Sequence, residues 1–320
     1  MTNQAIINRV LLRKKVLQSV YEQLNNESPS LDKAVKNLKF SIQQTYSLYN
    51  YLLLLIVDET EYISQKIDAA RHKNLPTEED LNPNTRFIDN KFAAVLKSNL
   101  DLQDYISDHK FSWTENYPEI LKDMYEFIQA HDSYKEYMAA ESTTFDDDKE
   151  IWRTLMKDFV IESESLEAML EDYSIFWNDD MEVVLSFVLK TIRRMSEKDG
   201  AAQKLLPMYR ETDDEAFGVK LFRSALINKD EYTELIDKNT KGWDIDRVAF
   251  MDKTILLIAV AELLNFPTIP VNVTMNEYIE LSKSYSSDKS PAFINGVLDN
   301  IVKDLTANNK LTKVKIVSNK

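Results

Sequence analysis

The stretch WDIDRVAFMDKTILLIAVAELLNFPTIPVNVTMNEYIELSKSYSSDKSPAFINGVLDNIVKDL, residues 243–305, determines the fold class. Its apolar residues recur at helical spacing, and nearly every side of the helix is apolar between Ile255 and Leu264. This pattern is typical of the buried central helix of a bundle. Pro267 and Pro270 then end the helix, because the residue before a proline is pushed out of the helical region.

Two further helix starts follow in the same stretch. Thr274 and Glu277 have the spacing of a capping box, which predicts a helix that begins near Thr274. Ser290 followed by Pro291 predicts the start of the last helix. Gly296 lies inside that last helix, where glycine is unfavourable, so we expect close packing or close approach of a ligand there.

The composition also favours an all-α protein. The chain has 320 residues with only four glycines and eight prolines, and 44% of the residues are hydrophobic. The absence of cysteine excludes disulfides and thiolate sites and suits a reducing cytoplasm. The N-terminus has no signal-peptide pattern, and the most apolar run, 52–57, is too short to cross a bilayer. We therefore expect a soluble, cytoplasmic protein that does not bind membranes.

The charge is unevenly distributed along the chain. The net charge of −14 argues against nucleic-acid binding, because lysine and arginine supply most of the affinity for phosphates. However, residues 146–182 contain thirteen acidic and three basic residues, and the first 21 residues contain four basic residues and no acid. The sequence therefore predicts an amphipathic basic helix over residues 5–25, with an apolar face made by Ile6, Val10, Leu17, Val20 and Leu24. A solvated charged surface is the simpler interpretation of its basic residues.

Several motifs resemble the bacterial transcription antitermination factor NusB. The motifs occur in the order and spacing of that family. Near the N-terminus they are R-x-x-x-R at 9–13 and L-Q-x-x-Y at 17–21. In the later stretch they are W-x-x-x-R at 243–247, D-x-x-I-L at 252–256, A-x-x-E-L-L at 259–264, I-P at 269–270, N-E-x-I-E-L at 276–281 and F-I-N-G-V-L-D at 293–299. The resemblance implies a NusB-like helical bundle. Because the chain is more than twice as long as a typical NusB, it would be a long form with a large helical insertion after the first helix.

The resemblance also implies an RNA-binding surface. Its expected residues lie on the first and last helices of the bundle and are Arg9, Arg13, Lys14, Lys15, Tyr21, Phe293 and Asn295. Arginine would neutralise phosphates, and a half-exposed phenylalanine could stack on an unpaired base; core packing is the alternative for the phenylalanine. The sequence departs from the family's pattern at Val10, Leu11, Lys14 and Lys289.

The family's partners suggest the function. Asp252 matches the acid that in NusB helps to bind NusE, a ribosomal small-subunit protein. The alternative interpretation is that Asp252 is an ordinary acid at a helix start, where the helix dipole favours negative charge. The resemblance implies binding of boxA-type single-stranded RNA together with NusE, contact with other Nus factors and RNA polymerase, and support of ribosomal RNA transcription. The alternative is a NusB-fold scaffold that binds only proteins. A NusB-like domain of an RNA methyltransferase is a third interpretation, but no catalytic domain follows Leu305.

We predict four parts of the chain. They are an N-terminal basic helix (1–27), a helical insertion (28–205), a NusB-like core (206–306) and a flexible basic tail (307–320). Within the insertion, single helices are expected over 40–67, 87–105 and 117–137. The segment 148–195 matches the later segment at an offset of 66 residues, with Trp177 on Trp243, which suggests a degenerate repeat of the NusB-like module.

No catalytic, metal or cofactor site is expected. The three histidines, His72, His109 and His131, are far apart and have no ligand spacing. Four scattered glycines cannot form a phosphate-binding loop. The sequence therefore favours a protein that is not an enzyme.

Overall fold

The computed structural model describes residues 4–25, 30–174, 177, 179–240 and 248–313. The described chain is all-α, as predicted, and contains no named strand; its single β-bridge joins Ile7 to Tyr209. The chain folds into two compact units. Unit 1 comprises Met1–Ile6 and Gln43–Met208, and unit 2 comprises Ile7–Ile42 and Tyr209–Lys320.

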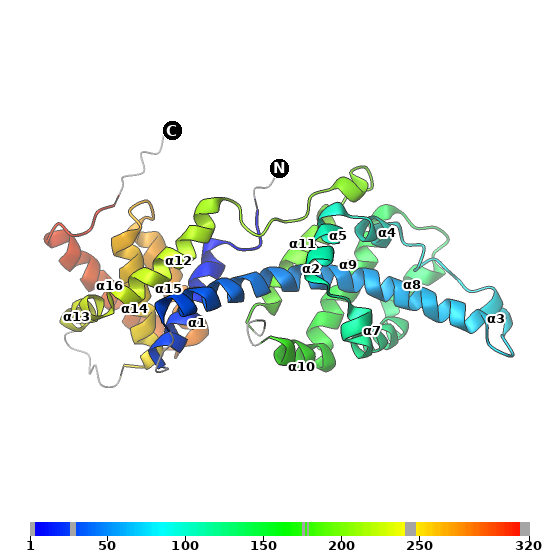
Figure 1. Cartoon of the computed structure of the whole chain (residues 1–320), viewed down its shortest axis with the longest axis horizontal. Helices are drawn as coiled ribbons and strands as arrows, with labels where there is room; N and C mark the ends of the chain where they lie inside the picture. The colour runs from blue at the N-terminus through cyan, green and yellow to red at the C-terminus, as the bar shows by residue number, and fades with distance from the viewer. Residues whose placement is uncertain (1–3, 26–29, 175–176, 178, 241–247, 314–320) are drawn as a thin grey trace. The chain divides into compact units, whose positions relative to one another are not determined.

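Unit 2 is a bundle built around one buried helix (Figure 1). Its helices are α1 (Arg9–Asn25), the first part of α2 (Leu31–Arg71), α12 (Thr212–Ile227), α13 (Lys229–Asn239), α14 (Phe250–Asn265), α15 (Val271–Tyr285) and α16 (Ser290–Ala307). Every residue of α14 from Thr254 to Leu263 is buried, because α1, α12, α13, α15 and α16 all pack against it. The prediction of a buried central helix is confirmed.

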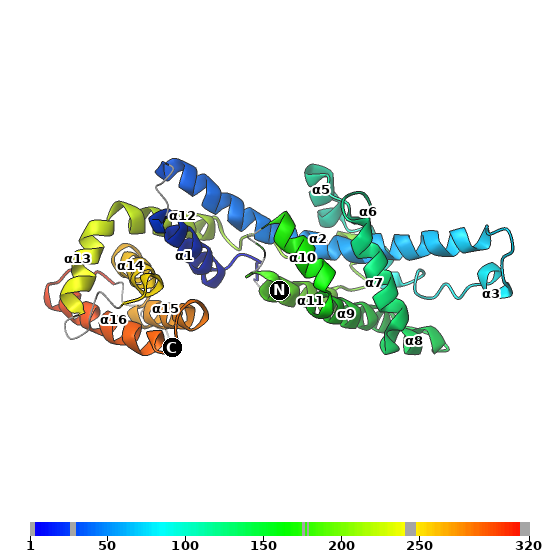
Figure 2. The same ribbon diagram turned by 90° about the horizontal axis from the view of Figure 1, so that it is seen from below.

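Unit 1 surrounds the second part of α2 (Figure 2). Its other helices are α3 (Glu78–Leu81), α4 (Lys91–Lys97), α5 (Leu100–His109), α6 (Trp113–Asn116), α7 (Pro118–Ala130), α8 (Asp132–Ala139), α9 (Phe145–Glu162), α10 (Glu164–Tyr173), α11 (Met181–Arg194) and the 3₁₀ turn η1 (Gly200–Ala202). The indole of Trp113 donates a hydrogen bond to the Tyr51 carbonyl, and Tyr49 hydrogen-bonds Thr191. These buried contacts fix α6 and α11 against α2.

Two details of the predicted helices are wrong. The first helix begins at Arg9 rather than residue 5, and Val10 is 57% exposed, so the buried face is formed instead by Leu11, Leu12, Val16, Leu17 and Val20. Thr274 does not cap α15, which already begins at Val271 after Pro270. At Gly296, no described side chain or backbone of another element lies within 4 Å of an added Cβ, so close packing is not seen there, and close approach of a ligand stays a prediction.

The helices of the two units repeat at the predicted offset. Shifted by 66 residues, α9 would cover 211–228, where α12 covers Thr212–Ile227, and α10 would cover 230–239, where α13 covers Lys229–Asn239. α11 would overlap α14 in the same way. α9 packs on α11 as α12 packs on α14. Trp243, the second tryptophan of the proposed repeat, lies outside the described residues.

Candidate functional site

Arg13 of α1 lies in the core of unit 2. Its Nε donates to Glu262 Oε2 at 2.7 Å and its Nη2 to Glu262 Oε1 at 2.9 Å, and its Nη1 donates to Glu277 at 3.2 Å. Arg13 is 3% exposed and Glu262 is fully buried. The two parallel hydrogen bonds have the geometry that makes arginine–carboxylate pairs strong. Arg13 therefore fixes α1 to α14 and α15, and its guanidinium does not face solvent.

Glu262 is the centre of a larger buried network. Its carboxylate also accepts hydrogen bonds from Thr274 Oγ1 at 2.9 Å and from Tyr278 OH at 3.1 Å. Burial alone would lower the pKa of Arg13, but the hydrogen bond and charge of Glu262 raise it. Burial and the same carboxylate raise the pKa of Tyr278. The network explains why Thr274 and Glu277 do not form a capping box: both side chains contact the buried ion pair instead.

Two more of the predicted RNA-binding residues are buried. Lys15 is 1% exposed and Phe293 is 6% exposed. Phe293 lies on the inner side of α16 with Ile294, Val297 and Leu298. Core packing, the alternative considered for Phe293, describes its position in this structure.

The other predicted residues lie at the surface. Arg9 pairs with Asp214 at 3.1 Å, and 43% of its side chain is exposed. The Lys14 ammonium lies 5.8 Å from the centre of the Tyr285 ring, and Gln18 donates to the Tyr285 hydroxyl at 3.2 Å. Asn295 is exposed near the start of α16.

Tyr21 lies beside a residue that the sequence analysis did not select. Its ring meets Phe250 edge-on, with 5.2 Å between the ring centres, and the two residues are 36% and 40% exposed. Lys14, Gln18 and Tyr21 follow one another at helical spacing, and together with Tyr285 and Phe250 we call them the α1 face. Phe250 could have been noticed because it precedes the continuous apolar run of α14 and lies off its buried part.

Asp252 connects two helices instead of projecting from the surface. It is 6% exposed, and its Oδ2 accepts a hydrogen bond from Ser290 Oγ at 2.9 Å. Ser290 Oγ also lies 2.9 Å from the hydroxyls of Ser286 and Ser287. Asp252 therefore fixes the connection between α15 and α16 to the start of α14. Oδ1 of Asp252 is buried and has no hydrogen-bond partner among the described residues.

The W-x-x-x-R motif and part of the basic tail cannot be placed. Residues 241–247 and 314–320 lie outside the described residues. The last described lysine, Lys313, donates to the Phe266 carbonyl at 3.0 Å, and burial lowers its pKa. Within the described ranges, no group of three or more His, Asp or Glu side chains could hold a metal ion, and none of the described helices is long and apolar enough to cross a membrane.

Comparisons with known proteins agree with the bundle of unit 2. The profile of the NusB family matches residues 182–303. The transcription antitermination protein NusB of Salinibacter ruber is 36% identical over 132 residues, which cover 39% of this chain and 82% of that protein. NusB of Bacillus licheniformis is 43% identical over 93 residues (29% of this chain, 72% of that protein), and NusB of Bacillus subtilis is 41% identical over 95 residues (30% and 72%). No solved structure matches the chain.

These similarities place the chain among helical-bundle proteins of the transcription antitermination class. The chain belongs to the NusB family. The residues that match the family profile begin inside unit 1, at α11, and do not include α1.

Proposed function

We propose that this protein is a non-enzymatic antitermination factor of the cytoplasm that binds boxA-type single-stranded RNA together with NusE. In this role it would contact other Nus factors and RNA polymerase and support ribosomal RNA transcription. The observation that carries the proposal is the α1 face of a NusB-family bundle, where the half-exposed Lys14, Gln18 and Tyr285 lie with the exposed rings of Tyr21 and Phe250. Cations bind phosphates and aromatic rings stack on unpaired bases, which are the two contacts that single-stranded RNA requires.

The seven residues expected to bind RNA would then act in two ways. Arg9, Lys14, Tyr21 and Asn295 are exposed or half-exposed and would contact the RNA directly. The other three, Arg13, Lys15 and Phe293, are buried and would hold α1 and α16 in position. Arg13 would thus support RNA binding through its ion pair with Glu262 and not through phosphate contact.

NusE would bind at the end of the α1 face near Phe250. Phe250 is 40% exposed beside Tyr21, and aromatic residues are enriched in protein interfaces. Asp252 lies two residues after Phe250, and its hydrogen bond to Ser290 would hold the α15–α16 connection in the shape that NusE meets. Asp252 would therefore act as a positioning residue for the partner.

The test is a titration of a short boxA-type RNA and a scrambled control against the full chain, with and without NusE, at several salt concentrations. We expect sequence-dependent binding that NusE strengthens. Arg9→Ala with Lys14→Ala should lower the slope of log K against log salt by roughly 1 to 2, because about 0.7 is lost with each single-strand phosphate contact. The control, Lys238→Ala with Lys303→Ala, removes the same charge from two other exposed ion pairs.

The alternative function, a scaffold that binds only proteins, is favoured by one feature of unit 1. A small pocket of about 170 Å³ between α9, α10 and α11 is lined by exposed Ile161 and buried Trp177, with Glu167 and Glu171 at its edge. Apolar and acidic side chains together suit an apolar segment that carries basic residues. A folded protein that binds neither RNA, with or without NusE, would favour this alternative.

A further inference from the structure

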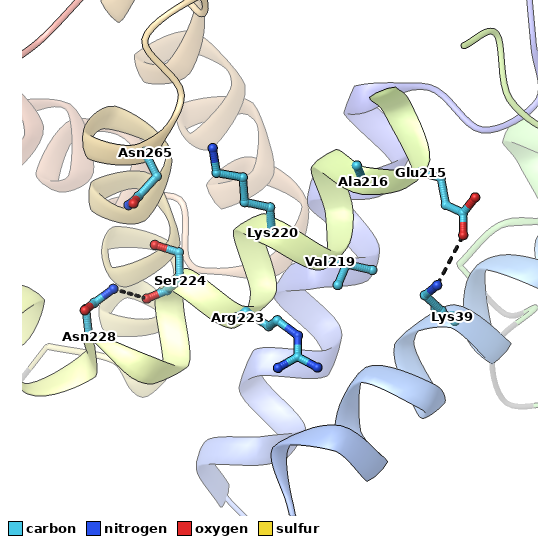
Figure 3. A pocket seen from close by; sticks show the side chains of 9 residues that line it. All are labelled: Lys39, Glu215, Ala216, Val219, Lys220, Arg223, Ser224, Asn228 and Asn265. Atoms are coloured by element: carbon cyan, nitrogen blue, oxygen red, sulfur yellow. Dashed lines mark hydrogen bonds and ion pairs between the residues drawn. The ribbon is translucent and has the colours of Figure 1, made fainter. Parts of the chain in front are cut away.

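A second basic surface of unit 2 is not part of the α1 face. It is an open groove of about 610 Å³ along α12 (Figure 3). Lys39 comes from α2 and Asn265 from the end of α14, while Lys220, Arg223 and Ser224 come from α12 and Asn228 follows that helix. We call these six residues the α12 groove. The full lining of this groove brings three cations and one acid, Glu215, together on a chain whose net charge is −14.

The cations of the α12 groove are available to an anion. Lys39 pairs with Glu215 at 3.2 Å and Arg223 with Asp32 at 2.8 Å, and all four side chains are at least 40% exposed. Exposed ion pairs of this kind contribute little to stability, so a phosphate can replace the carboxylates. The Lys220 ammonium lies 4.9 Å from the centre of the Phe266 ring, and no described carboxylate is within ion-pair distance of it.

The two asparagine side chains of the α12 groove are held in place by the buried Tyr232. The side-chain NH₂ groups of Asn228 and Asn265 both donate to the hydroxyl of Tyr232, at 3.1 and 2.9 Å. Tyr232 is 3% exposed, and its hydroxyl also lies 3.2 Å from Ser224 Oγ. Each amide donates a second hydrogen bond to a helix carbonyl. The two amides are therefore held in place, and their carbonyl oxygens accept no hydrogen bond from any described residue.

We propose that the α12 groove binds a second, flanking segment of single-stranded RNA. The proposal rests on the proposed function and extends the RNA contact to the surface of α12. Lys39, Lys220 and Arg223 would contact phosphates, while the oxygens of Asn228 and Asn265 would accept from base amino groups or ribose 2′-hydroxyls, which are the groups that proteins read in unpaired RNA. An acidic peptide would satisfy the cations, but its carboxylate side chains offer no donors to the amide oxygens, which only its backbone N–H groups could reach.

The experiment compares two RNAs on the full chain with NusE. One contains only the boxA-type element, and the other extends it by about ten unpaired nucleotides on each side, made either of RNA or of DNA. Wild-type protein should bind the RNA-extended ligand more tightly than the short one, and the DNA extension should add less because it lacks the 2′-hydroxyl.

The variant Lys220→Gln with Arg223→Gln should bind the short RNA like wild type but lose the gain from the extension. Its salt slope on the extended RNA should fall by roughly 1.4, because two single-strand phosphate contacts are removed. Lys238→Gln with Lys303→Gln loses the same charge elsewhere on unit 2 and should keep the gain. Circular dichroism checks that all variants remain helical.

Four results would overturn the proposal. An extension that adds no affinity to wild type, while the short RNA binds specifically, would refute the α12 groove and leave the proposed function intact. Equal losses in the groove and control variants would show an effect of total charge only. A groove variant that keeps the gain but loses NusE or another protein partner would mean that the groove binds acidic protein. A wild-type protein that binds neither RNA would refute both proposals.

Discussion

A buried arginine is retained in a helix only when its charge is neutralised and its donors are used. Arg13 meets both conditions through Glu262 and Glu277. Arg9, one helical turn earlier, forms an exposed pair with Asp214. The two arginines look equivalent in the sequence, but the structure gives them different energetic roles.

This difference predicts unequal costs of substitution. Arg13→Met should lower the free energy of unfolding of unit 2 by about 3 to 5 kcal/mol, because Glu262 would keep an uncompensated buried charge. Arg9→Met, the matched control, should cost about 1 kcal/mol or less. Urea denaturation followed by circular dichroism measures both. Arg13→Met with Glu262→Gln should be more stable than Arg13→Met alone, and equal losses for Arg9→Met and Arg13→Met would contradict the role of the ion pair.

Glu59, in the unit 1 part of α2, is a buried acid without a partner. It is fully buried, neither carboxylate oxygen has a hydrogen-bond partner among the described residues, and burial raises its pKa to about 9. In the unfolded chain the ordinary pKa is 4.5. Between these two values, unfolding releases the proton that the native state keeps. The contribution of Glu59 to the free energy of unfolding should therefore be most favourable below pH 4.5 and should fall as the pH rises toward 9.

The substitution Glu59→Gln tests this pH dependence. The amide cannot ionise, so at pH 7 it should raise the free energy of unfolding of unit 1 by roughly 2 to 3 kcal/mol and remove part of its decline with pH. Thermal or urea unfolding at several values between pH 5 and 8 gives the slope. Glu136→Gln, at an exposed position of α8, should leave the slope unchanged. An unchanged slope in Glu59→Gln would mean that this carboxyl is ionised in the folded protein.

At the scale of helices, two glycines show where close packing is required. A Cβ on Gly218 of α12 would lie 3.1 Å from Leu12 Cδ2 of α1, whereas one on Gly296 of α16 meets nothing within 4 Å. Gly218 therefore sets how closely α1 approaches α12. Gly296 weakens α16 without allowing any close contact in this structure.

Substitutions at the two glycines should have opposite effects. Gly218→Val should cost about 1 to 3 kcal/mol, because the added methyl groups displace Leu12 in a packed interface. Gly296→Ala should stabilise the protein by about 0.5 to 1 kcal/mol through the lower chain entropy of the unfolded state. The midpoint of urea denaturation should be lower than wild type for Gly218→Val and higher for Gly296→Ala. A destabilising Gly296→Ala would indicate a contact at α16 that the structure does not contain.

At the scale of the whole molecule, local patterns predict the elements well and distant partners poorly. The apolar run before Pro267 predicted the buried α14, because a helix that is apolar on all sides can only be buried. The prediction of a single helix over 87–105 is wrong, because the Asn99 side chain accepts a hydrogen bond from Leu102 N and caps the start of a new helix, α5. The single helix expected over 117–137 is likewise divided, at His131.

The candidate site was predicted only in part for the same reason. Lys14 is half-exposed and Tyr21 exposed, but neither helical spacing nor the family motif could show that Arg13 is buried. Its partner Glu262 is 249 residues away in the chain, and nothing in the sequence pairs them. Tyr21 lies beside Phe250 and Lys14 beside Tyr285, and these neighbours are also far apart in the sequence.

The path of the chain through unit 2 has a consequence for synthesis. α1 leaves the ribosome before α12 and α14, which pack against it and follow only after residues 43–208 of unit 1. At a translation rate of about 5 to 20 residues per second, Arg13 waits roughly 12 to 50 seconds for Glu262. During that interval the carboxylate that neutralises Arg13 has not yet been made. A nascent chain of this protein therefore carries α1 without its ion-pair partner while residues 43–208 of unit 1 are synthesised.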